Sequence, residues 1–113
     1  MKNAIEKQLR YNLPEGFYHI HTSESKQSIY FYIGTEKQLD MYENGHQFKD
    51  GDLKKFRVST HDAICGNSWS HEEVILNHFQ KSGWNAIIND NEIDTHDTNL
   101  MAKEIAKYLT SKI

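Results

Sequence analysis

The sequence predicts a small α+β domain, with helices packed on one face of an antiparallel sheet of about three to five strands. Three features predict this class: apolar residues at helical spacing near both ends of the chain, aromatic and β-branched runs between them, and Gly, Asn or Asp turn signals that separate those runs. The expected order is α-β-β-(β)-β-α-(β)-α, with the strands of weaker pattern in parentheses. A chain of 113 residues is expected to fold as one domain over residues 1–113.

The first predicted element is a helix over residues 3–12. Ile5 and Leu9 stand four residues apart with Leu13 beyond them, which is the spacing of one helix face. Pro14 ends the helix, because proline lacks a backbone N–H and its ring clashes with the preceding turn.

Residues 16–34 predict a β-hairpin. The runs 17–21 and 29–33 are rich in aromatic and β-branched side chains, and the polar residues 22–27 between them form the turn.

Two further strands are predicted after this hairpin. Residues 38–42 would form the first, turning at Asn44-Gly45, a dipeptide favoured in type I′ turns. Residues 53–60 would form the second, with Phe56 and Val58 on one face and Arg57 on the other.

A second helix is predicted to begin at Ser70. Ser70 and Glu73 match the S-x-x-E capping box, in which each residue satisfies a free backbone N–H of the first turn. Gly83 would end the helix, and Trp84 would fold back onto it. The helix would bury one apolar face, formed by Val74, Ile75, His78 and Phe79.

A short strand over residues 85–88, a turn over 89–91 and a last helix complete the predicted order. The last helix would start near residues 94–97, and its lysines lie off the apolar side. Lys107 and Lys112 lie near its C-terminal end, where positive charge interacts favourably with the helix dipole. That apolar side consists of Leu100, Met101, Ile105, Tyr108 and Leu109.

Composition limits the function classes. Thirteen basic and 16 acidic residues give a net charge of −3, which argues against a nucleic-acid-coating surface, so a nucleic-acid partner is not favoured. One cysteine, Cys65, cannot form an internal disulfide, and neither a membrane span nor a signal-peptide core is present, so a cytoplasmic protein without membrane contact is expected. The excess of lysine over arginine and the many Asn and Ile residues are typical of an A+T-rich bacterial or phage genome.

His19 and His21 form an H-x-H pair on a predicted strand. Residues two apart on a strand project from the same face, so the two imidazoles could share one metal ion. The competing interpretation is a pair of partly buried or solvent-facing histidines. We favour the second interpretation and expect no metal or cofactor, with His19 and His21 as the alternative metal site.

The ends of the predicted hairpin carry Gly-Phe-Tyr at residues 16–18 and Tyr-Ile-Gly at residues 32–34. These triplets resemble the two halves of the GIY-YIG nuclease signature. The resemblance implies that Tyr18 and Tyr32 position and activate the attacking water and that Glu72 or Glu73 holds a divalent metal. In that family an arginine on the following helix contacts phosphate, whereas the first arginine after residue 34 here is Arg57, on a predicted strand.

A metal-dependent hydrolase or GIY-YIG-like nuclease, with Tyr18, Tyr32 and Glu73 as its catalytic residues, is therefore the alternative function. The function that the sequence favours is non-enzymatic binding of another protein in a regulatory role. Tyrosines suited to an interface and a basic segment over residues 49–57 predict the contact surface. The expected binding residues are Tyr30, Tyr32, Tyr42, Lys49, Lys54, Lys55 and Arg57.

A specific form of this hypothesis is an accessory protein of a phage or mobile element that inhibits or modulates a bacterial host machine. A homodimer that pairs through the edge of the hairpin is a third hypothesis.

Overall fold

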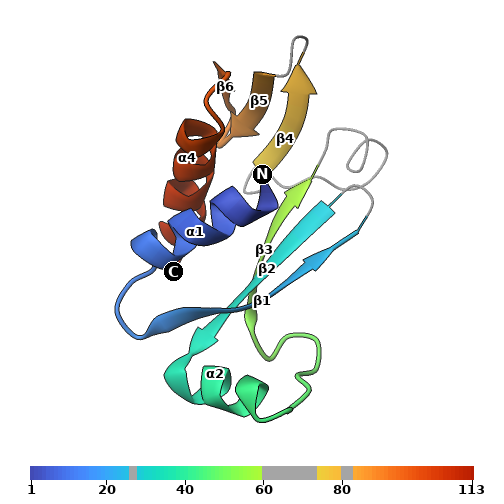
Figure 1. Cartoon of the computed structure of the whole chain (residues 1–113), viewed down its shortest axis with the longest axis vertical. Helices are drawn as coiled ribbons and strands as arrows, with labels where there is room; N and C mark the ends of the chain where they lie inside the picture. The colour runs from blue at the N-terminus through green and yellow to red at the C-terminus, as the bar shows by residue number, and fades with distance from the viewer. Residues whose placement is uncertain (26–27, 60–73, 80–82) are drawn as a thin grey trace.

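A six-stranded sheet runs through the computed structural model, which describes residues 1–25, 28–59, 74–79 and 83–113 (Figure 1). The strands lie in the sheet in chain order, and every neighbouring pair is antiparallel except β3 and β4, which are parallel. The strands are β1 (Phe17–Glu24), β2 (Ser28–Thr35), β3 (Lys54–Ser59), β4 (Val74–Phe79), β5 (Gly83–Ile88) and β6 (Asn91–Thr95). The α+β class is confirmed, with more strands than predicted.

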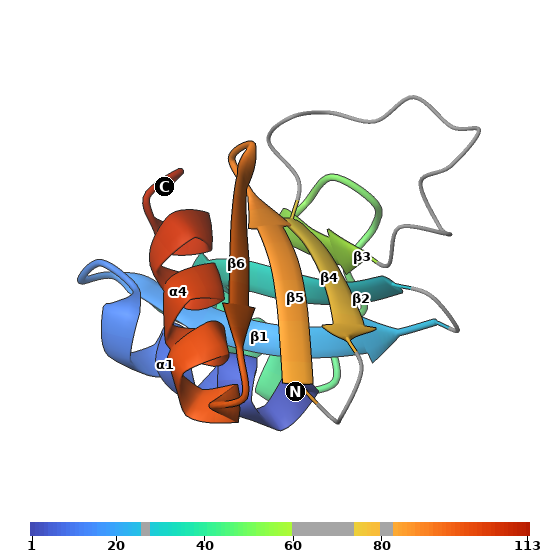
Figure 2. The same cartoon turned by 90° about the horizontal axis from the view of Figure 1, so that it is seen from above.

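The described residues also contain three helices, α1 (Lys2–Asn12), α2 (Glu36–Glu43) and α4 (Thr98–Thr110). Helices α1 and α4 pack side by side, as Figures 1 and 2 both show, and cover one face of the twisted sheet. Seen from above, β5 and β6 run across β1 and β2, so the two helices lie in the curve of the sheet (Figure 2).

The core lies between these two helices and the sheet. Alternate residues of β2 point inward, with Phe31 fully buried, and α4 turns one continuous face toward the sheet. These periods of two and 3.6 residues are what strand and helix geometry require of a buried face. The core cluster includes Ile5, Leu9, Phe31, Val58, Val74, Leu76, Ile88, Met101, Ile105 and Leu109.

Several predicted elements are confirmed: the first helix, the hairpin, the strand that contains Phe56, the strand over 85–88 and the last helix. The last helix begins after Asp97, whose carboxylate accepts hydrogen bonds from the backbone N–H groups of Asn99 and Leu100 at 3.0 and 3.1 Å. The predicted turn at 89–91 is a tight hairpin, in which Asn89 and Asp90 both have positive φ. It leads into β6, which the sequence did not predict.

The prediction of a strand over 38–42 is wrong, because these residues belong to α2. The Thr35 hydroxyl accepts from the Gln38 backbone N–H and the Gln38 side chain accepts from the Thr35 N–H, which makes a capping box. At the other end the N–H groups of Gly45 and His46 donate to the carbonyls of Tyr42 and Met41. This is a Schellman motif, so Asn44-Gly45 ends a helix and does not turn a hairpin.

The prediction of a helix through Val74 and Phe79 is also wrong, because these residues form β4 in the middle of the sheet. Val74, Ile75 and Leu76 are buried in succession, which a strand covered on both faces requires and one helix face does not explain. Ser70 and Glu73 lie outside the described residues. Gly83 begins β5, and the Trp84 indole N–H donates to the Thr98 hydroxyl at 2.9 Å.

Two adjacent residues of α4 test the placement of the core. Met101 is fully buried, whereas Leu100 is 45% exposed. We expect Met101→Ala to lower the free energy of unfolding by about 2–5 kcal/mol, because it leaves a cavity in the core. Leu100→Ala should change it by less than about 0.5 kcal/mol. Chemical denaturation of the two variants measures both values, and equal losses would contradict this helix orientation.

Candidate functional site

The sheet face opposite α1 and α4 carries the polar and aromatic side chains of β1, β2 and β3. Tyr30 and Tyr32 alternate with the buried residues of β2, so they point to this open face. The register places Tyr32 between His21 of β1 and Lys55 of β3. It places Tyr30 beside Arg57 in the same way.

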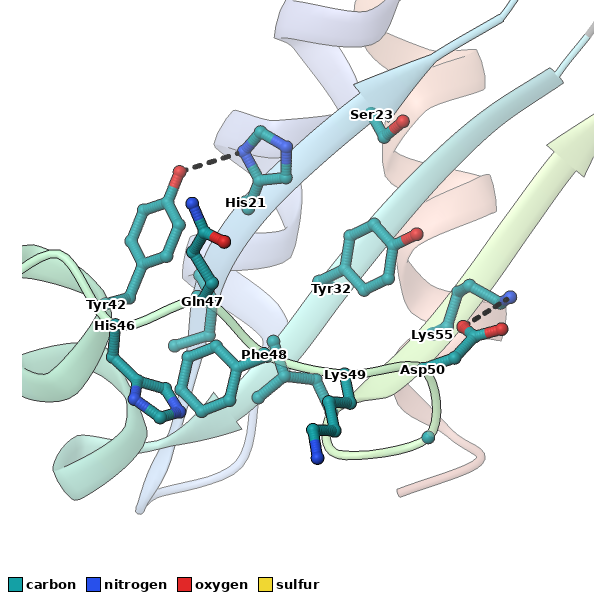
Figure 3. A pocket seen from close by; sticks show the side chains of 13 residues that line it. His21, Ser23, Tyr32, Tyr42, His46, Gln47, Phe48, Lys49, Asp50 and Lys55 are labelled. Atoms are coloured by element: carbon teal, nitrogen blue, oxygen red, sulfur yellow. Dashed lines mark hydrogen bonds and ion pairs between the residues drawn. The ribbon is translucent and has the colours of Figure 1, made fainter.

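A cavity of about 820 Å³ lies on this open face, between the strands and the segment 46–53 (Figure 3). Its volume falls in the range of small-ligand and side-chain pockets. The labelled side chains of Figure 3 surround one hollow, with His21, Tyr32 and Lys55 on the strands and Phe48 and Lys49 on the segment that crosses them. Its lining is Ile20, His21, Ser23, Tyr32, Tyr42, His46, Gln47, Phe48, Lys49, Asp50, Gly51, Leu53 and Lys55.

Gly34 allows α2 and residue 53 to approach the end of β2. A Cβ at this position would lie 2.6 Å from Oε1 of Gln38 and 3.0 Å from a methyl carbon of Leu53. The Gln38 side chain caps α2 and donates through Nε2 to the carbonyl of Asp52 at 3.1 Å. One side chain therefore joins the start of the helix to the segment that walls the cavity.

Local hydrogen bonds hold the rest of that wall. The Asp52 carboxylate accepts from the backbone N–H of Lys49 at 2.9 Å, and the Asp52 N–H donates to the Lys49 carbonyl at 3.1 Å. Gly51 takes the positive φ that this turn needs. The rings of His46 and Phe48 meet edge to face, with centroids 4.7 Å apart. Contacts within the segment thus hold the wall in shape.

His21 connects the helix α2 to the sheet inside the cavity. Its ring stacks on Tyr32 with centroids 6.0 Å apart, and its Nδ1 shares a hydrogen bond of 3.1 Å with the Tyr42 hydroxyl. The rings of Tyr42 and His21 are also 5.7 Å apart. This contact closes one end of the cavity with aromatic surfaces.

The charges that line the cavity are mainly positive. Lys49 and Lys55 contribute two cations, and the carboxylate of Asp50 lies 3.9 Å from the Lys55 ammonium with 94% of its side chain exposed. Such an exposed pair is weak, so it leaves much of the Lys55 charge available. Beside the cavity, Lys55 and Arg57 lie 5.4 and 5.9 Å from the centroid of the Tyr30 ring, within the range of cation–π contacts.

Four of the residues predicted to bind a partner line this one cavity: Tyr32, Tyr42, Lys49 and Lys55. Tyr30 and Arg57 continue the same face. Lys54 does not, because it pairs with Ile33 and therefore projects from the opposite side of the sheet. The structure thus brings together residues that the prediction drew from three separate segments, although it had assigned Tyr42 to a strand.

Sequence reasoning missed His46 and Phe48 as cavity residues. The signal that would have found them is the capping box of Thr35 and Gln38 together with the Gly45 helix end. A helix over 36–43 forces the chain to return across the open face before β3 begins, and it brings the following side chains over the strands.

The expectation that His19 and His21 share a face is wrong. A bulge between them shifts the register, so that His19 pairs with Ile33 and His21 with Tyr32. The two partners are consecutive residues of β2, and the histidines therefore point to opposite faces. Within residues 1–25, 28–59, 74–79 and 83–113, no group of three His, Cys, Asp or Glu side chains is placed to hold a metal.

Tyr18 and Tyr32, the tyrosines of the GIY-YIG resemblance, lie on the same open face. Tyr18 pairs with Gly34, two residues beyond Tyr32 along β2, and is 38% exposed. Glu73 lies outside the described residues.

In the part of the chain that is described, no helix has the length and apolar character needed to cross a bilayer.

His19 makes the stability of the fold dependent on pH. Its side chain is 7% exposed, and its Nε2 lies 2.7 Å from the Thr22 hydroxyl and 3.9 Å from a Glu6 carboxylate oxygen. Burial lowers the pKa of His19 below its ordinary value of 6.5, although Glu6 opposes this effect. The unfolded chain then binds a proton at a higher pH than the folded chain.

We therefore expect the free energy of unfolding to decrease as the pH falls below 6.5, toward the lower pKa of the folded state. His19→Gln should remove this part of the pH dependence, because glutamine does not titrate. Denaturation at a series of pH values measures the effect, and an NMR titration of the His19 ring measures its pKa directly. A pKa above 6.5 would show that Glu6 outweighs burial.

Gly34→Ala tests the wall of the cavity. We expect a loss of about 1–3 kcal/mol in the free energy of unfolding, because the added methyl displaces Gln38 and Leu53. Adding Gln38→Ala should cost less in this background than in the native chain, since it removes the closest clash. Strictly additive losses in this double-mutant cycle would contradict the contact.

Comparisons with protein-family models, with curated proteins and with solved structures each found no match to this chain.

Proposed function

We propose that this chain is a non-enzymatic regulatory protein that binds another protein through the open face of β1, β2 and β3. The observation that carries the proposal is the meeting of Tyr32, Tyr42, Lys49 and Lys55 around one cavity. Tyrosine is among the side chains that contribute most energy in protein interfaces, and the two lysines add a charge that a complementary partner surface can match. A side chain of the partner that enters the cavity would lose its contact with water.

The hydrogen-bonded wall supports a binding role. The turn at residues 49–52 and the cap of α2 are fixed by their own hydrogen bonds, so little conformational entropy is lost when a partner binds. The adjacent Tyr30 and Arg57 extend the surface along β2 and β3. A partner could therefore contact a patch wider than the cavity itself.

The specific form we propose is a cytoplasmic accessory protein of a phage or mobile element that modulates or inhibits a bacterial host machine. Its support is compositional: 11 lysines to two arginines, with nine Asn and 11 Ile, indicate an A+T-rich genome. This form is tested by the identity of the partner.

The test is an affinity capture from a bacterial lysate treated with nuclease and EDTA, read by mass spectrometry. We expect one protein at near-equal amount with the native chain. Lys55→Glu should reduce its recovery at least about tenfold, because a reversed charge at the cavity repels the surface that the lysine attracts.

Lys103→Glu is the matched control, because Lys103 is an exposed lysine of α4, on the other side of the molecule. Its recovery of the partner should equal that of the native chain. Equal recovery with Lys55→Glu would place the partner elsewhere and overturn the proposed surface. Absence of any stoichiometric partner, together with divalent-metal-dependent hydrolysis that Tyr32→Phe abolishes, would replace the proposal with an enzyme.

A further inference from the structure

We propose that the cavity binds an acidic peptide segment of the partner, with one aromatic side chain of that segment inserted and its flanking carboxylates against Lys49 and Lys55. This inference rests on the proposed function and names the chemistry that the open face recognises. Three features of the cavity carry it: an apolar interior, cations on its rim and a wall held by its own hydrogen bonds.

The interior is apolar and aromatic. Ile20 is 6% exposed and lies with Leu53 and Phe48 in the lining, while Tyr32 and Tyr42 add ring surface. Aromatic groups prefer edge-to-face or offset contacts with other rings, and such contacts add to the energy of burial. An aromatic side chain therefore uses this interior better than a polar one.

The rim supplies positive charge at two sides. Lys55 comes from β3 and Lys49 from the segment that crosses the strands, so the two cations belong to different elements of the lining (Figure 3). Among the described residues of the lining, the carboxylate belongs to Asp50, whose side chain is 94% exposed and 3.9 Å from Lys55. A ligand carboxylate can replace that contact at little cost.

Polar groups next to the cations suit a peptide backbone. Ser23 and Gln47 line the cavity and each can donate or accept a hydrogen bond. An extended peptide needs such partners for the N–H and C=O groups that it brings from water. The lining thus offers a contact for each part of the peptide segment: its ring, its carboxylates and its backbone.

A peptide fits these charges better than a nucleic acid does. Asp50 lies on the rim and the chain as a whole carries a net charge of −3, so a polyanion with one phosphate per nucleotide meets repulsion. A short acidic segment places its few charges only where the lysines are. Charge complementarity therefore favours the peptide.

The test uses the full chain labelled with ¹⁵N and a blocked pentapeptide of sequence EEFEE. We expect amide shifts at residues 21, 32 and 46–55, and an affinity at least about tenfold higher than that of the uncharged peptide QQFQQ. The peptide EEAEE, which lacks the ring, should also bind about tenfold or more weakly. Salt at about 0.5 M should weaken EEFEE and leave QQFQQ nearly unchanged.

Variants assign the binding to the cavity. Lys49→Gln and Lys55→Gln should each weaken EEFEE about two- to fivefold, while Lys103→Gln on α4 should leave its affinity unchanged. Glutamine removes the charge but stays polar and is only slightly shorter than lysine, so we expect folding to be retained. An unchanged ¹⁵N spectrum outside the substituted residue verifies this.

Each other result overturns the inference. Equal affinity for EEFEE and QQFQQ would show that the ligand does not need acidic residues. Amide shifts confined to α1 or α4 would show that the peptide binds outside the cavity. Tighter binding of an oligothymidylate than of EEFEE makes nucleic acid the occupant, and light scattering that shows a Lys55-dependent dimer makes it a second copy of this chain. If EEFEE fails while a partner is captured through Lys55, the proposed function stands and only the ligand chemistry is wrong.

Discussion

The alternation of β2 is the constraint on which the rest of this structure depends. One set of its side chains, with Phe31 and Ile33, is fully buried against the helix-covered face, and the intervening residues Tyr30 and Tyr32 must then point to the other face. Because β2 lies between β1 and β3, its register also decides what stands beside each tyrosine. The requirement to bury Phe31 therefore also places His21 and Lys55 beside Tyr32 on the other face, although neither residue contributes to the core.

A single irregularity in β1 changes the chemistry of both faces. The bulge between His19 and His21 sends the first imidazole toward Glu6 and the second toward Tyr32. His19 becomes a buried histidine whose lowered pKa links stability to pH, and His21 becomes a cavity residue. A regular strand would have placed both side chains on one face, with the buried surface of the sheet shifted by one residue.

The cavity depends on a close backbone approach at Gly34. Because Gly34 has no side chain, the Gln38 side chain can cap α2 and also donate a hydrogen bond to the carbonyl of Asp52. One side chain therefore contacts both the start of the helix and the wall of the cavity. The resulting pocket combines rigidity with a mixed lining of rings and cations. The proposed recognition of a partner segment rests on this lining and on the hydrogen bonds that hold the wall.

The sequence by itself determined the α+β class, the first helix, the hairpin and the last helix. Those results follow from local physics: apolar period, turn residues and the Pro14 stop act within a few residues of themselves. Of the residues that line the cavity, it singled out as binding residues only Tyr32, Tyr42, Lys49 and Lys55. Only the tertiary structure decided the state of residues 74–79, because a run of buried apolar residues fits a helix or a central strand equally until its neighbours β3 and β5 are present. It likewise decided the faces of the two histidines, since a bulge is a mismatch between two strands and leaves no signal in either one alone.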